Sequence, residues 1–267
     1  GEDGALAAFP PAEIEAADLT GLALELAQWG AAPGDLAYLT PPPAGALAEA
    51  RALLRMLGAL DGAGRITEHG RALAALPLHP RLGHMLETAG PEAAALAALI
   101  ADRDPLRGAP SDLSLRLEAL RDAKRFARQR PFEVNAGAVQ RIQAEAKRLR
   151  GRAGAVAEKM SPAAMAALAY PDRIGQRRKG DAPRYVLSGG KGAVLNDGDP
   201  LGGAPYLVAV DLDGDPRDAR IRLAAQISER EIRDLFADQI GWSDVCAWSR
   251  RERRVVARRQ ERLGALV

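Results

Sequence analysis

The stretch from Leu39 to Met85 constrains the fold most, because two helical patterns within it are separated by strong interruptions. Pro41–Pro43 stop any preceding helix, since proline lacks a backbone N–H and disfavours a helical residue before it. Leucines recur at three- and four-residue steps over residues 44–57, which predicts an amphipathic helix. Asp61–Gly64 then predicts a hairpin turn, and Thr67 predicts the N-cap of another helix. With the helical pattern that precedes Leu39, these are the parts of a compact winged helix.

The remaining chain shows two further patterns. Residues 81–168 are predicted to be all helical, with apolar stripes such as Val139, Ile142, Ala146 and Leu149. After residue 171, short β-prone stretches alternate with glycine turns, which predicts a small barrel. A further helix is predicted over residues 227–240, beginning at Ser228.

We therefore predict a mainly α fold with a small β part, divided into four regions. These are an entry arm with the winged helix (1–80), a helical bundle (81–168), a β-barrel (169–226) and a final region (227–267). The final region is predicted to hold a helix and the truncated start of a C-terminal domain. Because its sequence is partly periodic after Trp242, we expect a helical tail.

Composition limits the possible site classes. The single Cys246 cannot form an intrachain disulfide or a cysteine-cluster zinc site, and a lone thiol fits a cytoplasmic location. His69, His79 and His84 form no H-E-x-x-H pair, so packing or surface roles are predicted and no metal site. The sequence has no signal peptide and no apolar run of 18 residues, which predicts no membrane span and no membrane partner.

Charge is unevenly distributed along the chain, although the formal net charge is only +2. Residues 1–115 hold 7 basic and 15 acidic side chains, whereas residues 116–191 hold 18 basic and 7 acidic. Residues 192–267 are nearly balanced, with 12 basic and 13 acidic. A central basic block suits an anion-binding surface, such as one for nucleic acid. The alternative is a set of solvated helix faces, since a composition bias towards arginine would also fill such faces.

Several short segments carry a family resemblance. In the first part of the chain they are PPP (41–43), LGALD (57–61), TEHGR (67–71) and LPLHPRLGHML (76–86). Later they are SDLSLRLEAL (111–120), RIGQRR (173–178), RYVLSGGKGAVL (184–195) and GDPLGGAPYLVAVDLDG (198–214). Together and in order, these segments resemble the C-terminal accessory region of DEAH-box helicases of the HrpB type.

The resemblance implies an ATP-dependent nucleic-acid helicase with RecA-like motor domains that bind ATP and Mg²⁺, and an OB-like fold for the barrel. The chain itself has no G-x-x-x-x-G-K-[ST] loop for phosphates, since Ser188–Gly192 lacks the spacing, and no DEAH box. We therefore expect the accessory region without the motor, with no catalytic residues, no cofactor and no ATPase activity of its own. Its implied partners are the motor domains and single-stranded RNA or DNA, which the sequence does not distinguish.

Two groups of basic residues are the candidate nucleic-acid-binding sites. The group at the barrel entry comprises Arg173, Arg177, Arg178, Lys179, Arg184 and Lys191. The group on the helix predicted between Ser111 and Pro131 comprises Arg121, Lys124, Arg125 and Arg128. OB folds combine a positive groove with aromatic platforms, but only Tyr170, Tyr185 and Tyr206 are near the barrel group. We therefore predict backbone contacts, little base readout and a strong salt dependence.

Two alternatives remain open from the sequence. The basic residues at the barrel entry also fit a solubilising rim on a folding module. The acidic, leucine-rich residues 1–115 fit a protein-docking or scaffold module that makes no nucleic-acid contact of its own. The winged helix itself is predicted to dock rather than to read DNA, because it offers few of the basic and amide side chains that a recognition helix presents.

Overall fold

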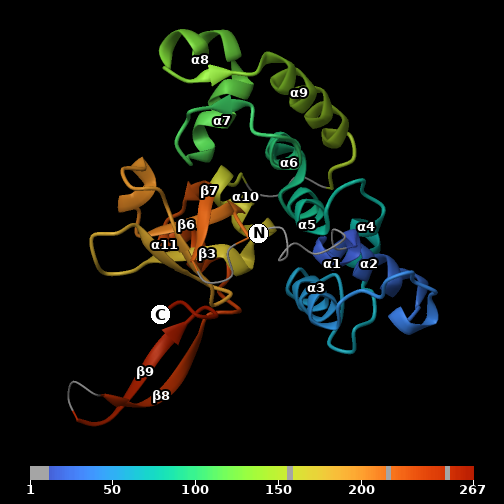
Figure 1. The fold of residues 1–267 in the computed structure, drawn as a ribbon, viewed down its shortest axis with the longest axis vertical. Helices are drawn as coiled ribbons and strands as arrows, with labels where there is room; N and C mark the ends of the chain where they lie inside the picture. Colours follow the sequence, from blue (N-terminus) through green and yellow to red (C-terminus); the bar gives the residue numbers. More distant parts are fainter. Residues whose placement is uncertain (1–11, 155–158, 215–217, 250–252) are drawn as a thin grey trace, which may run out of the picture. The chain divides into compact units, whose positions relative to one another are not determined.

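The computed structural model describes residues 12–154, 159–214, 218–249 and 253–267 (Figure 1). They belong to two compact units that divide between His84 and Met85, and each unit is described by itself. None of the helices in the described ranges combines the length and the apolar character needed to cross a membrane.

The first unit is helical. Its elements are α1 (Glu13–Ala16), α2 (Thr20–Trp29), a 3-10 turn (Pro33–Asp35), α3 (Ala44–Met56), α4 (Glu68–Ala74) and the first half of α5 (Pro80–Ala89). The amphipathic spacing of leucines decides which faces meet, and the core contains Leu24 of α2, Leu54 of α3 and Leu73 of α4. The helices predicted on either side of the turn at Asp61 are therefore both confirmed.

The wing is smaller than the sequence predicted. α3 is followed by Gly58, whose φ of 70° is a conformation that favours glycine. Leu60 and Ile66 form one isolated antiparallel bridge, so the expected pair of strands is reduced to a turn closed by a single residue pair. Asp61 stabilises this turn by accepting two backbone N–H hydrogen bonds at 2.9 Å. Thr67 caps α4 as predicted, accepting from the N–H three residues on at 2.9 Å.

The second unit begins with helices. They are the end of α5, a 3-10 turn (Gly90–Ala93), α6 (Ala94–Ala101), α7 (Leu113–Arg121), α8 (Ala123–Gln129), α9 (Ala136–Arg150) and α10 (Pro162–Ala169). The predicted apolar stripe of α9 is buried, and α9 packs along α6. β1 (Leu106–Arg107) and β2 (Glu133–Val134) form a short antiparallel pair that the sequence did not indicate.

The single helix predicted between Ser111 and Pro131 is two helices. Asp122 lies between α7 and α8 with φ −153° and ψ 90°, which is outside the helical region. Its side chain accepts a hydrogen bond from the backbone N–H of Arg125 at 2.9 Å and so caps α8. The prediction missed this break because the apolar spacing continues across it.

The predicted barrel is confirmed. Its strands are β3 (Ile174–Arg177), β4 (Arg184–Leu187), β5 (Gly192–Val194), β6 (Tyr206–Leu212) and β7 (Asp218–Gln226), with 3-10 turns at Pro171–Arg173 and Pro200–Gly203. They close in the order β3-β4-β5-β7-β6, and β6 pairs back with β3. Every pairing is antiparallel except the parallel one between β5 and β7. Tyr185, Leu207 and Ile221 fill the interior.

Ser111 joins the start of α7 to the barrel. Its backbone N–H donates to Asp199 Oδ2 at 2.9 Å, and its hydroxyl donates to the carbonyl of Ile221 at 3.3 Å. Its own carbonyl accepts from the N–H of Ala224 at 2.8 Å. The helices and the barrel therefore share a hydrogen-bonded junction between residues more than 85 positions apart.

The expected helical tail is wrong beyond residue 240. Ser228 caps α11 (Glu229–Leu235) as predicted, but the chain then forms an antiparallel hairpin of β8 (Gly241–Ser249) and β9 (Arg254–Arg262). Figure 1 shows this hairpin as a two-stranded ribbon beside the barrel. After β9 the chain returns to the barrel, where the N–H of Ala265 donates to the carbonyl of Ser188 at 2.9 Å and Leu266 is buried.

Candidate nucleic-acid interface

A row of arginines crosses the outer face of the barrel. Arg184 on β4 is in register with Val194 on β5, and Val194 is in register with Arg220 on β7. The backbone N–H of Arg178, just after β3, donates to the carbonyl of Arg184 at 2.8 Å and extends the row by one strand. Since neighbouring strands lie about 4.8 Å apart, Arg178, Arg184 and Arg220 span roughly 15 Å. We call these three residues the barrel arginine row.

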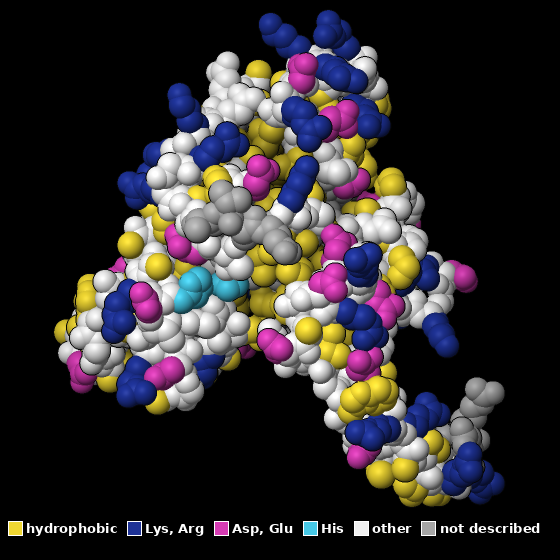
Figure 2. All heavy atoms as spheres, turned by 180° about the vertical axis from the view of Figure 1, so that it is seen from behind, with side chains coloured by type: hydrophobic (Ala, Val, Ile, Leu, Met, Phe, Trp, Pro, Cys, Tyr) yellow, Lys and Arg dark blue, Asp and Glu magenta, His cyan; other side chains and the backbone are white. Residues whose placement is uncertain are grey.

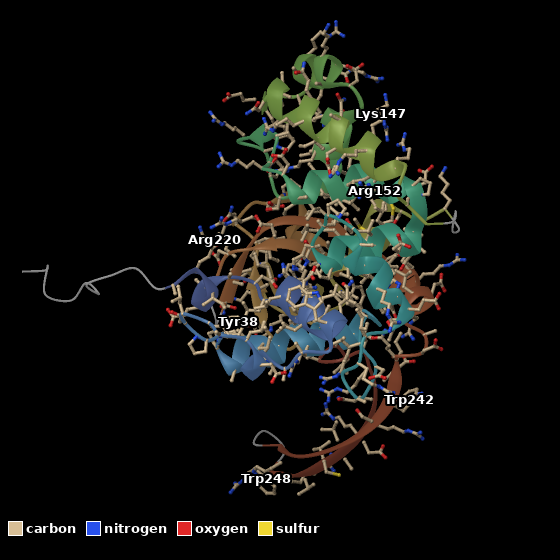
Figure 3. All side chains as sticks on the ribbon, turned by 90° about the vertical axis from the view of Figure 1, so that its right-hand side faces the viewer. Tyr38, Lys147, Arg152, Arg220, Trp242 and Trp248 are labelled. Carbon is tan, nitrogen blue, oxygen red and sulfur yellow. The ribbon has the colours of Figure 1, made fainter. Side chains whose placement is uncertain are left out.

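The charges of the barrel arginine row are little compensated. All three side chains are exposed, and Figure 3 labels Arg220. Arg184 Nη1 lies 3.7 Å from Asp218 Oδ2, an exposed pair of the kind that contributes little. Within the ranges that the structure describes, the side chains of Arg178, Arg220 and the neighbouring Lys179 form no ion pair. The row therefore presents positive charge to solvent.

Two of the predicted contact residues support the barrel itself. Arg177 Nε donates to the carbonyl of Gly202 at 2.7 Å, and its Nη2 donates to a second carbonyl at 3.2 Å. Arg173 Nη1 donates to the carbonyl of Val210 at 3.2 Å, and its guanidinium lies 4.9 Å from the centre of the Tyr170 ring. Both arginines are partly buried, so their geometry favours a structural role.

Lys191 is exposed but separate from the row. It lies in the turn between β4 and β5, where its carbonyl accepts from the N–H of Leu187 at 2.8 Å. It lies three residues before Val194, the residue of β5 that is in register with the row, and is therefore roughly 10 Å away along the strand.

The second predicted group lies on α7 and α8. Arg121 ends α7, and Lys124, Arg125 and Arg128 lie on α8, which is anchored by the buried Phe126. The four basic side chains are exposed, and Arg125 Nε donates to Gln129 at 3.2 Å. Figure 2 shows Lys and Arg side chains gathered at the end of the molecule that α8 occupies. We call these four residues the α8 cluster.

Arg116 belongs to the same basic stretch of sequence but not to its surface. Its side chain is 4% exposed, and both Nε and Nη2 donate to the carboxylate of Asp104, the closest pair at 2.6 Å. Its Nη1 donates to the carbonyls of Asp112, at 3.0 Å, and Pro110. This arginine stabilises the loop before α7 and contributes no accessible charge.

Aromatic platforms are scarce on the barrel. Tyr185 is fully buried, and its hydroxyl lies 2.9 Å from the carbonyl of Leu201 and 3.0 Å from that of Ala204. Burial raises the pKa of this phenol above its usual value of 10.0. Tyr170 is also buried, and Tyr206 is partly buried beside Gln176. Of the three tyrosines near the barrel group, Tyr185 and Tyr170 are therefore closed to a base, and Tyr206 lines a cavity.

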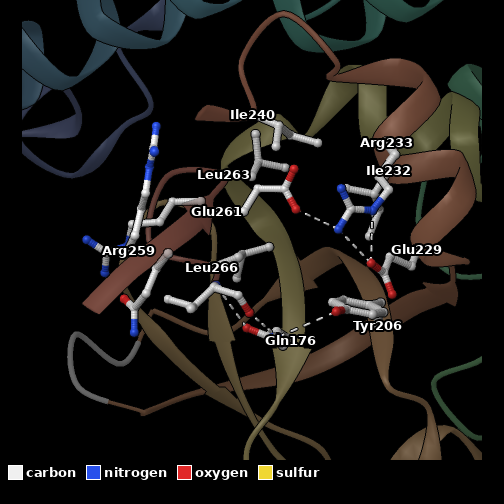
Figure 4. Close-up of a pocket in the computed structure, with 13 residues that line it drawn as sticks. Gln176, Tyr206, Glu229, Ile232, Arg233, Ile240, Arg259, Glu261, Leu263 and Leu266 are labelled. Carbon is white, nitrogen blue, oxygen red and sulfur yellow. Dashed lines mark hydrogen bonds and ion pairs between the residues drawn. The ribbon is translucent and has the colours of Figure 1, made fainter. Parts of the chain in front are cut away.

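A cavity of about 320 Å³ lies between the barrel, α11 and the root of the hairpin (Figure 4). Its lining includes the apolar residues Ile232, Ile240, Leu263 and Leu266. Three of its charged residues are paired with one another, since Arg233 Nη2 lies 2.9 Å from both Glu229 and Glu261. Hydrogen bonding to Arg233 lowers the pKa of Glu261, so that carboxylate is ionised and already paired. Among the described residues, no three His, Cys, Asp or Glu side chains come together as metal ligands would.

The chain is similar to known helicase sequences and structures. The helicase-associated (HA2) winged-helix model matches residues 50–78, from the middle of α3 to just beyond α4. The ATP-dependent RNA helicase HrpB of Escherichia coli (strain K12) is 36% identical over 260 residues, which is 95% of this chain. A crystal structure of the E. coli DExH-box NTPase HrpB matches 99% of the chain with a TM-score of 0.76 and 34% identity. The chain is homologous to a segment of HrpB.

A second crystal structure, of the E. coli DEAH/RHA helicase HrpB, agrees, with a TM-score of 0.74, 30% identity and 99% of the chain covered. The chain spans only 30% of the length of the HrpB sequence and 31% and 32% of the chains in the two crystal structures. The resemblance inferred from the sequence segments is therefore confirmed, and the chain corresponds to an accessory part of that helicase.

One member of the barrel arginine row was missed by sequence reasoning. Charged and apolar residues alternate over Arg220–Leu223, which predicts a strand with one face exposed. The alternation was enough to place Arg220 on the outer face. Its alignment with Arg184 depends on the parallel pairing of β5 with β7, which no local signal in the HrpB-like sequence reveals.

Proposed function

We propose that this chain is the accessory region of an ATP-dependent helicase like HrpB, and that its barrel holds the backbone of single-stranded nucleic acid. The observation that carries the proposal is the barrel arginine row, three exposed guanidinium groups aligned across neighbouring strands. Guanidinium groups bind phosphate oxygens through paired, charge-assisted hydrogen bonds. A row about 15 Å long suits a strand of phosphates better than a single small anion.

We further propose that the barrel is OB-like. Five strands in the order β3-β4-β5-β7-β6 support this, because OB folds are five-stranded barrels of this type. OB folds bind oligonucleotides on their second and third strands and on the loop after the first. In this chain the second strand carries Arg184, and the loop after the first strand carries Arg178 and Lys179. The positive residues thus lie where an OB fold would bind.

The proposed contacts are to phosphates, so the barrel would not by itself distinguish RNA from DNA. The α8 cluster is proposed as a second backbone contact, since its four basic side chains are exposed. The RecA-like motor domains of the parent protein, which would bind ATP and Mg²⁺, are the proposed protein partner, in the cytoplasm. We propose the four-region division at 1–80, 81–168, 169–226 and 227–267 as the functional layout of this segment.

The test compares two double variants in fluorescence anisotropy with labelled single-stranded RNA and the matching DNA. Arg178→Ala with Arg220→Ala removes two of the three row charges. Arg71→Ala with Arg230→Ala removes the same charge from exposed arginines elsewhere. Each lost phosphate contact lowers the slope of log K against log salt by about 0.7 on a single strand. We expect the row variant to lose a slope of about 1.4 and the control variant to match the unmodified chain.

A second candidate function is a protein-docking module without nucleic-acid contact. It is favoured by the acidic first unit, which also exposes Trp29 by 66% and Leu39 fully. The same titration separates the two functions. Absence of salt-sensitive binding by the unmodified chain, at low salt and with both RNA and DNA, would favour docking and sink the nucleic-acid proposal.

A further inference from the structure

The hairpin of β8 and β9 exposes a large apolar face. Trp242, Cys246 and Trp248 point to the same side of β8, because side chains alternate along a strand. The register places Ala257 opposite Cys246 and Val255 opposite Trp248. All five residues are exposed, with Trp242 and Trp248 at 62% and Val255 at 63%. We call these five residues the tryptophan face.

The hairpin carries net positive charge, which its two sides share unequally. Asp244, Arg259 and Glu261 lie on the side of the tryptophan face, whereas Arg254, Arg258 and Arg262 lie on the opposite side. Residues 241–249 and 253–262 hold five arginines, at 253, 254, 258, 259 and 262, against Asp244 and Glu261. Arg259 lies with its guanidinium 5.5 Å from the centre of the Trp242 ring. An exposed indole beside guanidinium groups combines a flat π surface with charges that attract phosphate.

The hairpin has only two strands, and its tryptophan face is exposed. A two-stranded hairpin is marginally stable by itself in water, and three or more strands or a packed helix are normally required. Figure 3 shows Trp242 near the root of the hairpin and Trp248 near its far end. Their six-residue separation corresponds to roughly 20 Å along the strand. A ligand bound along this length would bury both indole rings and stabilise the hairpin.

We propose that the tryptophan face stacks unpaired bases of single-stranded nucleic acid, while the hairpin arginines contact its phosphates. The net charge of the hairpin favours this occupant, because five arginines against two carboxylates over its described residues repel basic partners and attract a polyanion that contacts both sides. The tryptophan face also supplies exposed aromatic rings, which the barrel lacks at Tyr185 and Tyr170 because both are buried. The inference relies on the proposed function only for the class of ligand; it assigns a separate site with a different mode of contact.

The experiment uses the full chain and two 12-nucleotide probes, one of oligouridine and one abasic strand with the same number of phosphates. Trp248→Ala is compared with Trp29→Ala, which removes an equally exposed indole from the first unit. Loss of one stacked base weakens binding by about 5- to 150-fold. We expect that loss for Trp248→Ala with oligouridine only, rescue by Trp248→Phe, and unchanged affinity for the abasic strand. Trp29→Ala should match the unmodified chain with both probes.

The outcomes separate this inference from the barrel proposal. The barrel variant Arg178→Ala with Arg220→Ala should weaken binding of both probes, because it removes phosphate contacts only. Equal affinity of Trp248→Ala and Trp29→Ala for oligouridine would overturn the stacking proposal, whatever the barrel variant does. Self-association of the chain that Trp248→Ala abolishes, with no change in oligouridine affinity, would assign the face to a second copy and would also overturn it.

Discussion

Arg116→Ala is expected to destabilise the second unit strongly, although Arg116 lies in the most basic part of the sequence. The side chain is 4% exposed and donates to Asp104 and to the carbonyls of Pro110 and Asp112. Alanine would remove one hydrogen bond from each of two backbone carbonyls and leave the Asp104 carboxylate without its counter-ion. The exposed Arg121, five residues on at the end of α7, is the matched control.

The expected loss follows from the groups that Arg116 leaves behind. The Asp104 carboxylate is 41% exposed and water can solvate it once Arg116 is gone, so the loss is that of charge-assisted hydrogen bonds, about 1.5–3 kcal/mol. For a domain of 150–250 residues, each kcal/mol shifts the melting temperature by about 2–4 °C, so Arg116→Ala should lower it by roughly 3–12 °C. Substitution of an exposed side chain usually changes stability by less than about 0.5 kcal/mol, so Arg121→Ala should shift it by about 2 °C at most.

Thermal unfolding followed by far-ultraviolet circular dichroism measures both shifts. Arg116→Lys adds a further comparison, since lysine keeps the charge but cannot donate to Asp104 in the paired manner of a guanidinium. It should fall between the unmodified chain and Arg116→Ala. Equal melting temperatures for Arg116→Ala and Arg121→Ala would refute the reasoning that separates structural from surface arginines in this chain.

Two further perturbations test buried groups. Burial, together with the nearby charge of His69, lowers the pKa of His84 from 6.5 to about 4, so the unfolded chain binds a proton that the folded chain excludes between these values. The stability of the first unit should therefore be full above pH 6.5 and fall by up to about 3 kcal/mol towards pH 4, and His84→Gln should flatten this decline in urea unfolding. Tyr185→Phe should cost the barrel about 1–2 kcal/mol by removing the buried hydroxyl that lies within hydrogen-bond distance of the carbonyls of Leu201 and Ala204; unchanged urea unfolding would contradict this role.

Local signals predicted much of the fold. The caps at Thr67 and Ser228, the turn at Asp61–Gly64 and the short strands of the barrel all depend on residues close together in sequence. Such signals are strong because capping and turn geometry are decided within a few residues. The break at Asp122 was missed because the apolar spacing of the predicted helix continues across it.

The tail and the candidate site were harder to predict because distant partners decide them. The sequence after Trp242 is partly periodic, which predicts a helix. Residues 241–249 and 254–262 nevertheless form strands, which pair Trp248 with Val255 and Cys246 with Ala257. The basic residues likewise differ in their contacts. Arg177 donates a hydrogen bond to the carbonyl of Gly202, whereas the side chain of Arg178, next to it, is exposed. Sequence supplied the charges of the candidate interface but not which of them solvent can reach.

The hydrogen bonds of Ser111 can form only late in the synthesis of the chain. The hydroxyl and carbonyl of Ser111 find their partners only at Ile221 and Ala224, 110 and 113 residues later in the chain. At a synthesis rate of about 5–20 residues per second, this interval lasts roughly 6–20 s. The start of α7 therefore has to wait, incompletely hydrogen-bonded, until the ribosome has made β7. A nascent chain stalled before Ile221 should be more readily cut near Ser111 by proteases than one released after Leu235.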